Sequence, residues 1–297
     1  MAEIKVYNYG MWNGWTLNNF FVDFKYPCLK EFNLVDSSEE EADVIIFSHY
    51  TGIYKEVMTN PNNGDPLPFK NKNALWLFFS LENWGHPNMD KCDYAITSRS
   101  DFEHQRHACL PHCITYVEMW KDILLNKPKE VEEKPKFCSY MASNPIPFRQ
   151  EFFDQLSQYK FVEAAGNCRT NVAKLPLGED LKMNYIKDFK FNMAFENSCS
   201  PGYICEKHVQ PMIVNSLPIY KGAPNVLKYF NTKSFLNWHD YNCSDVELLE
   251  AVKRADQDVG FFKSMWEQPW FVDNKIHYDI SMKKAKDVFT QILRQVK

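Results

Sequence analysis

The 297-residue sequence predicts an α/β fold with two domains, each built around a parallel sheet. At roughly 150 residues per domain, a chain of this length is expected to form two domains. With 45% apolar and 24% charged residues, the composition is that of a globular protein with a substantial core. Short apolar segments alternate with helical patterns in both halves of the chain, which is typical of a parallel sheet covered by helices.

The first half of the chain contains short apolar segments that predict strands. They lie at residues 4–9, 43–48, 74–80 and 94–97. Between the first two, residues 17–32 carry apolar side chains at helical spacing. This strand–helix–strand order predicts a βαβ unit near the start of the chain.

The domain boundary is expected in the segment 126–136, which reads NKPKEVEEKPK. A charged segment bracketed by prolines has the composition of an exposed connection. We therefore expect an N-terminal domain over residues 1–130 and a C-terminal domain over residues 131–275. Residues 276–297 have apolar side chains three and four positions apart, which predicts a last helix that packs back on the body of the protein.

The second half repeats the alternation of strands and helices. The pattern predicts strands at 137–141, 190–195 and 217–220, and helices at 147–159 and 204–215. Ser244 and Glu247 form a capping box, so a further helix should extend to about Arg254. The second domain is therefore again expected to be α/β.

Charge and hydropathy exclude several classes of protein. Lys and Arg number 34 against 38 Asp and Glu, a net charge of −4 without a basic cluster, so no nucleic-acid partner is expected. The apolar segments are far shorter than the ~20 residues that span a bilayer, so no transmembrane segment is expected. The N-terminus lacks the regions of a secretory signal peptide, and we expect a cytoplasmic location.

The nine cysteines predict reduced thiols rather than a disulfide framework, because their number is odd and their spacing irregular. The histidines and cysteines between His104 and Cys113 have no second paired half at zinc-site spacing, and residues 108–111 predict a short buried strand instead. Asp256 and Asp258 form a D-x-D pattern that binds metal in some sugar transferases. A solvated turn is the preferred interpretation of that pattern, and no metal site is expected.

The most informative segment is residues 189–207, FKFNMAFENSCSPGYICEK. It predicts a buried strand, a polar loop and a helix with Glu206 and Lys207 in its first turn. A helix N-terminus with a lysine can hold a diphosphate without a metal. Glu206 can accept hydrogen bonds from ribose hydroxyls, and Asn197 or Tyr203 can contact the same nucleotide. These residues fit a nucleotide diphosphate sugar, although a simple Glu206–Lys207 ion pair is the alternative.

The same segment resembles the motif of the α-1,3/4-fucosyltransferases, glycosyltransferase family 10, which reads roughly F-x-x-x-F-E-N-[ST], a short loop, then Y-[IV]-T-E-K. Here it extends from Phe191 to Lys207, with Cys205 in place of the threonine. Residues 218–225, PIYKGAPN, are similar to the family's P-[IV]-x-x-G-[AS]-P-N turn, and the resemblance implies a donor contact at Gly222. It also implies a GT-B-type fold, with two Rossmann-like domains facing across a cleft.

Two further segments carry the resemblance. Ser143, Asn144 and Arg149 match the family's S-N-x-x-x-x-R segment, whose arginine contacts the donor phosphates, so all three are expected to bind the donor. A surface arginine is the alternative for Arg149. Residues 79–83, FSLEN, resemble the family's strand that ends in a glutamate acting as general base.

The residues themselves support Glu82 as the base. An apolar strand delivers its carboxylate to the strand's C-terminal end, facing the expected cleft, where it can take a proton from an attacking sugar hydroxyl. A capping or ion-paired carboxylate is the alternative. Asn83 beside it is expected to contact the acceptor. Trp12 and Trp15, in the loop after the first strand, can stack on acceptor sugar rings, with ordinary packing as the alternative.

These features predict an inverting, metal-independent glycosyltransferase that moves a sugar from a nucleotide diphosphate sugar to a glycan hydroxyl. GDP-fucose is the donor implied by the resemblance, and no cofactor is expected. One alternative keeps the fold and mechanism with a UDP-sugar such as UDP-xylose. The other is a non-catalytic sugar- or nucleotide-binding protein. We expect a short enzyme in a bacterial cytoplasm or, if viral, a host cytoplasm, and the oligomeric state is left open.

Overall fold

The structure is a computed structural model that describes residues 3–11, 32–49, 58, 67, 69–276 and 279–296. The chain forms two compact units. Unit 1 contains Met1–Met119, Pro201–Tyr203 and Tyr278–Lys297, and unit 2 contains Trp120–Ser200 and Ile204–His277. The first unit thus ends at Met119, ahead of the expected boundary at residue 130. Two segments from the second half of the chain, Pro201–Tyr203 and Tyr278–Lys297, also belong to unit 1.

Packing explains why the charged segment 126–136 is not a free connection. The Trp266 indole N–H lies 3.0 Å from the main-chain oxygen of Pro128. Lys127 donates to the main-chain oxygen of Gln268 at 3.0 Å, and its ammonium lies 3.4 Å from the centre of the Trp270 ring. Burial lowers the pKa of Lys127 to about 7. Most of the segment is exposed, as expected, but these contacts make it part of unit 2.

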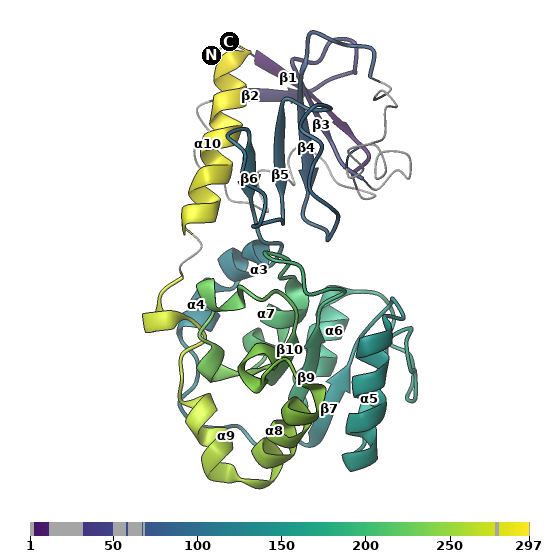
Figure 1. Cartoon of the computed structure of the whole chain (residues 1–297), viewed down its shortest axis with the longest axis vertical. Coiled ribbons are helices and arrows are strands. Elements are labelled where there is room, and N and C mark those ends of the chain that lie inside the picture. The colour runs from purple at the N-terminus through teal and green to yellow at the C-terminus, as the bar shows by residue number, and fades with distance from the viewer. Residues whose placement is uncertain are drawn as a thin grey trace. The chain divides into compact units, whose positions relative to one another are not determined.

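Unit 1 contains a six-stranded parallel sheet in the order β2-β1-β3-β4-β5-β6 (Figure 1). The strands are β1 Glu3–Tyr9, β2 Asn33–Asp36, β3 Val44–Phe47, β4 Leu75–Ser80, β5 Tyr94–Thr97 and β6 His107–Cys109. The predictions of β1, β3, β4 and β5 and of a short strand near Cys109 are confirmed. β2 was not expected, because none of its four residues is buried and it lacks an apolar pattern. The helix predicted over residues 17–32 falls almost wholly outside the described residues.

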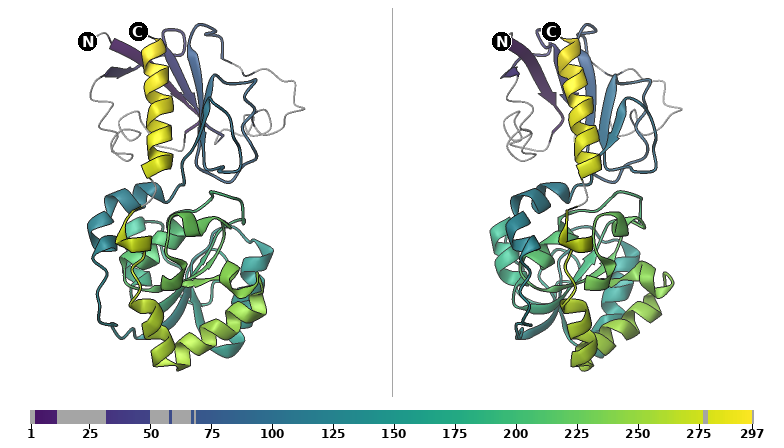
Figure 2. Two further views of the ribbon diagram at one scale, coloured as in Figure 1. Left: turned by 60° about the vertical axis from the view of Figure 1, so that its left-hand side comes forward. Right: turned by 90° about the vertical axis from the view of Figure 1, so that its left-hand side faces the viewer.

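Helix α10 (Asp279–Gln295) packs against β5 and β6 of the same unit, as the views of Figure 2 show. Its buried side chains are Ala285, Val288, Phe289, Ile292 and Leu293. Near its end, the Gln295 amide donates to the Tyr94 hydroxyl of β5 at 2.8 Å. The apolar face recognised in the sequence therefore covers one side of the sheet. Unit 1 also includes the short helix α3 (Ile114–Met119).

Unit 2 contains a five-stranded parallel sheet in the order β11-β10-β9-β7-β8. The strands are β7 Lys136–Tyr140, β8 Val162–Ala164, β9 Phe189–Phe195, β10 Leu217–Lys221 and β11 Leu236–Asn237. The predicted strands correspond to β7, β9 and β10, whereas β8 and β11 have only three and two residues and were missed. All residues of β10 and all but one of β9 are buried, so this pair forms the centre of the unit.

The helices of unit 2 fall into two groups by their contacts, α4 and α6 with α7, and α5 and α9 with α8. Their bounds are α4 Lys121–Leu125, α5 Pro147–Tyr159, α6 Glu179–Ile186, α7 Glu206–Ile213, α8 Asp245–Gln257 and α9 Val259–Trp266, with 3₁₀ turns at Val226–Lys228, Thr232–Ser234, Trp238–Tyr241 and Val272–Asn274. Ser244 caps α8 by accepting from the Glu247 N–H at 3.3 Å, which confirms half of the predicted capping box. Across the described ranges, every helix is too short or too polar to span a bilayer.

Candidate active site

Glu82 lies just past the carboxyl end of β4 in unit 1. The last four residues of β4 and the following Leu81 are buried, so Glu82 is the first charged side chain after the strand. Its main-chain oxygen accepts from the Ser98 hydroxyl at 3.1 Å and from the Trp84 N–H at 3.0 Å. Its carboxylate oxygen Oε2 accepts from the Tyr203 hydroxyl at 3.2 Å. The strand thus presents a partly buried carboxylate that is held at both its main chain and its side chain.

Tyr203, which the sequence predicts to contact the nucleotide, donates its hydroxyl to Glu82 in the structure. Its side chain is 1% exposed. Ser200 and Ile204 on either side of the segment Pro201–Tyr203 belong to unit 2, whereas the segment itself belongs to unit 1. Glu82, which accepts from the Tyr203 hydroxyl, is 121 positions away in sequence, so no local pattern indicates this contact.

Two more polar side chains lie at the same edge of the sheet. The side-chain oxygen of Asn83 is buried and, among the described residues, has no hydrogen-bond partner. His49 follows β3; its Nδ1 lies 2.8 Å from the Ser80 hydroxyl. His49 was missed, although its position two residues after the buried strand β3 was a usable signal. Trp12 and Trp15, predicted to contact the acceptor, lie outside the described residues.

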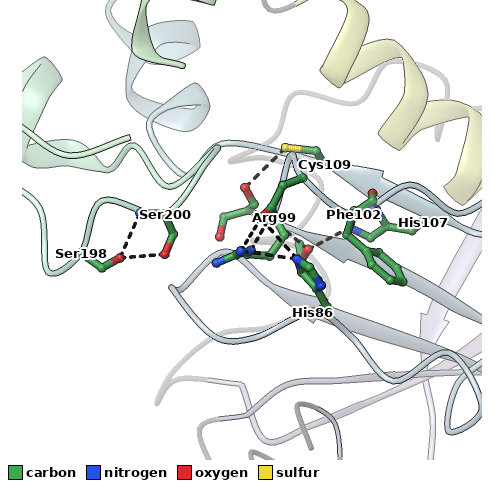
Figure 3. A network of polar contacts seen from close by, with 10 residues as sticks. His86, Arg99, Phe102, His107, Cys109, Ser198 and Ser200 are labelled. Carbon is green, nitrogen blue, oxygen red and sulfur yellow. Dashed lines mark hydrogen bonds and ion pairs between the residues drawn. The ribbon is translucent and has the colours of Figure 1, made fainter. Parts of the chain in front are cut away.

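A charged cluster follows β5 (Figure 3). The Arg99 guanidinium donates to both carboxylate oxygens of Asp101, at 2.9 and 2.5 Å, and His86 lies 3.3 Å from the same carboxylate. Burial opposes ionisation of Asp101, but these hydrogen bonds lower its pKa. The nearby His107 uses both ring nitrogens within the protein, toward Thr97 at 2.8 Å and the Phe102 oxygen at 3.0 Å. A structural role for His107 is thus preferred over zinc binding.

In unit 2, α7 begins at Glu206, with Lys207 next to it. Lys207 Nζ lies 3.2 Å from Glu206 Oε1 and 3.0 Å from the Cys205 sulfur. Lys182 of α6 lies 3.5 Å from the same Glu206 oxygen. Glu206 and Lys207 are therefore brought together at the helix start as the sequence predicted, and the ion pair considered as the alternative is present as well.

The electrostatics around Lys207 keep its ammonium charged. Burial alone would lower the pKa of Lys207, but Cys205, Glu206 and Glu196 together raise it well above the ordinary value. Burial also raises the pKa of the Cys205 thiol. Lys207 therefore supplies a fixed positive charge at the start of α7, where the helix dipole also favours an anion.

Glu196 is a functional candidate that sequence reasoning missed. It follows β9 and is fully buried. It accepts from the Cys205 N–H at 2.8 Å and from the Cys205 thiol at 2.5 Å. Burial raises the pKa of Glu196, while Lys207 acts to lower it. Glu196 is the glutamate of the family motif, directly before Asn197, so its position was visible in sequence, but its contact with the start of α7 was not.

Gly222 lies against the buried Glu196 of this cluster. A Cβ placed on Gly222 would lie 2.5 Å from Glu196 Cγ and 2.5 Å from the Tyr220 hydroxyl. Such distances are far inside van der Waals contact, so only glycine leaves room for the buried carboxylate. Gly222 therefore shapes the predicted donor region by its lack of a side chain.

Arg149 and Asn197 meet at the carboxyl edge of the unit 2 sheet. Arg149 lies in the first turn of α5 and is 1% exposed, which excludes the alternative of a surface arginine. Its Nη1 donates to the side-chain oxygen of Asn197. Its Nε is buried and, in the part of the chain that the structure describes, has no hydrogen-bond partner. A buried guanidinium with unused donor capacity is suited to an anionic ligand.

The remaining predicted donor residues lie in the loop that joins β7 to α5. Ser143 and Asn144 are exposed there. Lys221, which was not predicted, ends β10 with its ammonium 2.6 Å from Asp245 and 4.3 Å from the centre of the Trp238 ring. The carboxyl ends of β7, β9 and β10 thus gather most of the predicted donor residues at one edge, the usual ligand edge of a parallel sheet.

Asp256 and Asp258 are already engaged by protein groups. Asp256 accepts from Lys160 at 2.9 Å and from the Tyr159 hydroxyl at 3.0 Å. Asp258 caps α9 by accepting from the Phe261 N–H at 2.9 Å. Asp256 lies in the last turn of α8 and is largely buried, so the expected solvated turn is wrong for this residue. Neither carboxylate points to a metal site.

Comparison with known proteins identifies the family. The sequence model described as "Glycosyltransferase family 10 (fucosyltransferase) C-term" matches residues 131–294, more than half of the chain. The chain belongs to glycosyltransferase family 10. This confirms the resemblance found in the motif segments. The matched range covers the donor-side residues of unit 2, and Glu82 lies outside it.

Several curated fucosyltransferases are related to the chain at moderate identity. The chain is 32% identical over 164 residues to the putative fucosyltransferase R654 of Acanthamoeba polyphaga mimivirus, covering 52% of this chain and 27% of that protein. It is 34% identical over 167 residues to the alpha-(1,3)-fucosyltransferase FucT of Helicobacter pylori, covering 54% of this chain and 34% of that protein. It is 23% identical over 224 residues to the human 4-galactosyl-N-acetylglucosaminide 3-alpha-L-fucosyltransferase FUT6, covering 73% of this chain and 59% of that protein. The chain therefore spans less than two thirds of these relatives.

Solved structures support the fold of this family 10 chain along nearly its whole length. An alpha1,3-fucosyltransferase crystallised with GDP superposes with a TM-score of 0.76 at 21% identity, covering 98% of this chain and 90% of that chain. The same comparison with a GDP-fucose complex gives a TM-score of 0.73, also at 21% identity. The predicted α/β fold of the GT-B type is confirmed.

Proposed function

We propose that the protein is an inverting fucosyltransferase that moves fucose from GDP-fucose to a hydroxyl group of a glycan acceptor without a metal ion. The observation that supports this most strongly is the cluster at the start of α7, where Glu206 and Lys207 match the family motif. The GDP-fucose named for a structural neighbour suggests the donor. The galactosyl-N-acetylglucosamine named for the FUT6 relative suggests a first acceptor to test.

On the donor side, Glu206 accepts hydrogen bonds from the ribose hydroxyls in this proposal, and Lys207 and Arg149 bind the diphosphate. The diphosphate gains negative charge as the bond to the sugar breaks. Fixed positive charges and the N–H groups at the start of α7 stabilise that charge in the transition state. No metal ion is needed for this stabilisation, because the cations belong to the protein.

On the acceptor side, Glu82 takes the proton from the attacking hydroxyl. The hydroxyl oxygen bonds to the anomeric carbon while the bond from that carbon to the diphosphate breaks, so a single displacement inverts the configuration. Asn83 supports this proposal, because its buried side-chain oxygen can accept a hydrogen bond from an acceptor hydroxyl. Trp12 and Trp15 are proposed to stack on acceptor sugars.

The experiment that tests this function measures transfer of labelled sugar from GDP-fucose, GDP-mannose and UDP-xylose to galactosyl-N-acetylglucosamine. We expect transfer from GDP-fucose and a loss of at least 100-fold in Glu82→Gln, the lower range for removal of a general base. Transfer only from UDP-xylose would show that the donor is a UDP-sugar, and the proposed mechanism would stand. Donor binding with no transfer to any acceptor would instead favour a binding protein.

A further inference from the structure

A cavity of about 490 Å³ opens at the amino edge of the unit 2 sheet, opposite the edge that carries the predicted donor residues. Lys136, the first residue of β7, and Lys190, the second residue of β9, both line it. Asp256 in the last turn of α8 and Val259 at the start of α9 line it as well. Its volume is typical of a site for a small molecule. All of its lining residues belong to unit 2, so the cavity is a feature of this unit alone.

Part of the cavity lining is apolar. The rings of Phe137 and Phe262 belong to it, and both residues are buried, at 8% and 5% exposed. Val259 and Val131 also line it, but they are 67% and 36% exposed. A ligand with an apolar body that covered these valines would remove apolar surface from water, which stabilises the bound state.

The polar part of the lining carries an excess of positive charge, with five lysines against three carboxylates. Lys160 and Lys190 both bind the Asp256 carboxylate, at 2.9 and 3.3 Å, so a single negative charge faces two ammonium groups. Lys263 is exposed, and among the described residues its ammonium has neither a hydrogen bond nor an ion pair. These three lysines therefore retain positive charge that an anion can use.

The other charges of the lining do not cancel this excess. Lys134 pairs with Glu132 at 2.7 Å. Lys136 pairs at 2.9 Å with Glu163, which lies outside the lining. The third carboxylate, Glu133, is exposed to solvent, where water screens its charge. An anionic group near Asp256 would thus meet more cations than carboxylates.

We propose that this cavity binds a small amphipathic organic anion, in which a phosphate, sulfonate or carboxylate group is joined to an apolar body. The anionic group lies among Lys160, Lys190 and Lys263. The apolar body covers the two phenylalanines and the exposed valines. The site is distinct from the proposed donor site and does not depend on the proposed function.

The test uses the fluorescent sulfonate 1-anilinonaphthalene-8-sulfonate (ANS), titrated onto the intact protein. We expect saturable binding of one dye per chain. In Lys190→Met, the dissociation constant should rise on the order of 10-fold, the effect of one hydrogen bond to a charged group. The exposed Lys263→Met should raise it by about 2- to 5-fold, as for an exposed ion pair. Lys253→Met is the matched control, because this lysine pairs with Glu250 in α8 at 2.7 Å and lies outside the lining.

Competition identifies the chemistry that the site recognises. Octyl phosphate should displace ANS, whereas 1-octanol or inorganic phosphate at the same concentration should not, because each lacks one half of the amphipathic ligand. Displacement by 1-octanol alone would show a purely apolar site, and displacement by inorganic phosphate alone a simple anion site. Displacement by GDP would place the dye at the opposite edge of the sheet. Each of these three results would overturn the proposal.

The variants decide between a built site and non-specific binding of the dye. Equal ANS affinity in Lys190→Met, Lys263→Met and the Lys253→Met control would show an adventitious additive only, and the proposal would fail. If Lys190→Met unfolds, because Lys190 also binds the main-chain oxygen of Asp256 at 3.1 Å, the exposed Lys263→Met decides alone. An unchanged dissociation constant in that variant would then contradict the proposal.

Discussion

Lys207 is the residue on which the donor-side account depends most. It is partly buried beside Cys205 and Glu206, and the buried Glu196 lies one contact further away. Glu196 contacts the Cys205 thiol and N–H, so the carboxylate, the thiol and the ammonium form one connected group. The cysteine that replaces the family's threonine still donates a hydrogen bond here. A threonine hydroxyl and a cysteine thiol can both donate to a carboxylate and accept from an ammonium, as Cys205 does with Glu196 and Lys207.

Replacing Lys207 by methionine should weaken GDP binding by about 10- to 100-fold, since a hydrogen bond to a charged group contributes about 1.5–3 kcal/mol. Isothermal titration calorimetry measures this directly. Lys187→Met is a suitable control, because this lysine is exposed and its ammonium donates to the Asn184 side-chain oxygen at 3.4 Å. Equal GDP affinity in the Lys207 variant and the control would remove Lys207 from the donor site.

Gly222→Ala should lower the free energy of unfolding by about 1–3 kcal/mol, the usual cost of overpacking a buried site. The added Cβ would meet Glu196 and Tyr220 at 2.5 Å, and neither side chain has space to move within this buried cluster. Gly260→Ala in α9 is the matched control, with its nearest atom at 3.2 Å and a helical position that favours alanine. Urea denaturation compares the two variants. A stability loss no larger in Gly222→Ala than in the control would contradict this packing argument.

At the scale of elements, helix α7 carries a buried histidine beside its donor-side residues. The His208 ring lies 4.3 Å from the ring of Tyr220 and 4.5 Å from that of Phe235, between centroids. Within the described chain, neither of its ring nitrogens has a hydrogen-bond partner. Burial lowers the pKa of His208 to about 3. The helix is therefore fixed on the sheet by a neutral imidazole.

This histidine should make the protein sensitive to acid. The unfolded chain binds a proton on His208 below about pH 6.5, whereas the folded chain does not until about pH 3, so its contribution to stability is complete above pH 6.5 and is lost as the pH falls. His208→Leu should flatten this fall by up to about 1.4 kcal/mol per pH unit. Some acid sensitivity should remain from His107 in unit 1, whose pKa burial lowers to about 4. Parallel stability curves from pH 7 to 5 would contradict the prediction.

Elements and contacts could be predicted where they depend on residues close together in the sequence. The strands β4, β5, β9 and β10 were predicted closely, because continuous apolar runs mark buried parallel strands. Strands β2, β8 and β11 were missed because they are short or poorly buried. Glu206 and Lys207 were predictable because their arrangement is local to one helical turn. The contact between Tyr203 and Glu82 was not, since it joins distant segments and depends on the assembled fold.

At the scale of the whole molecule, the domain boundary shows the same limit. Residues 126–136 are mostly exposed, as their composition indicated, but unit 1 ends before them and tryptophans from the far end of unit 2 pack on this segment. Likewise, the last helix belongs to the first unit. Such exchanges between distant parts of the chain leave no signal in local composition. The fold class was nevertheless predictable from the alternation of strands and helices.

The whole reaction should proceed without a divalent metal. Lys207 and Arg149 are the cations proposed to bind the leaving diphosphate, while Asp256 and Asp258 bind protein groups. Transfer from GDP-fucose should therefore keep its full rate after exhaustive treatment with EDTA. The measurement compares initial rates with EDTA and with added manganese. A strict requirement for manganese would contradict the proposed charge stabilisation.

The proposed function requires that the chain bind a GDP-sugar at the carboxyl edge of the unit 2 sheet. The most direct measurement is a thermal-shift panel of GDP-fucose, GDP-mannose, GDP, UDP-xylose, UDP-galactose, UDP-glucose and UDP on the intact protein. A ligand at about 100 times its dissociation constant stabilises the folded state by about 2.7 kcal/mol, which is readily measured. We predict that GDP and GDP-fucose raise the melting temperature and that UDP does not. Stabilisation by UDP and its sugars alone would contradict the proposed donor.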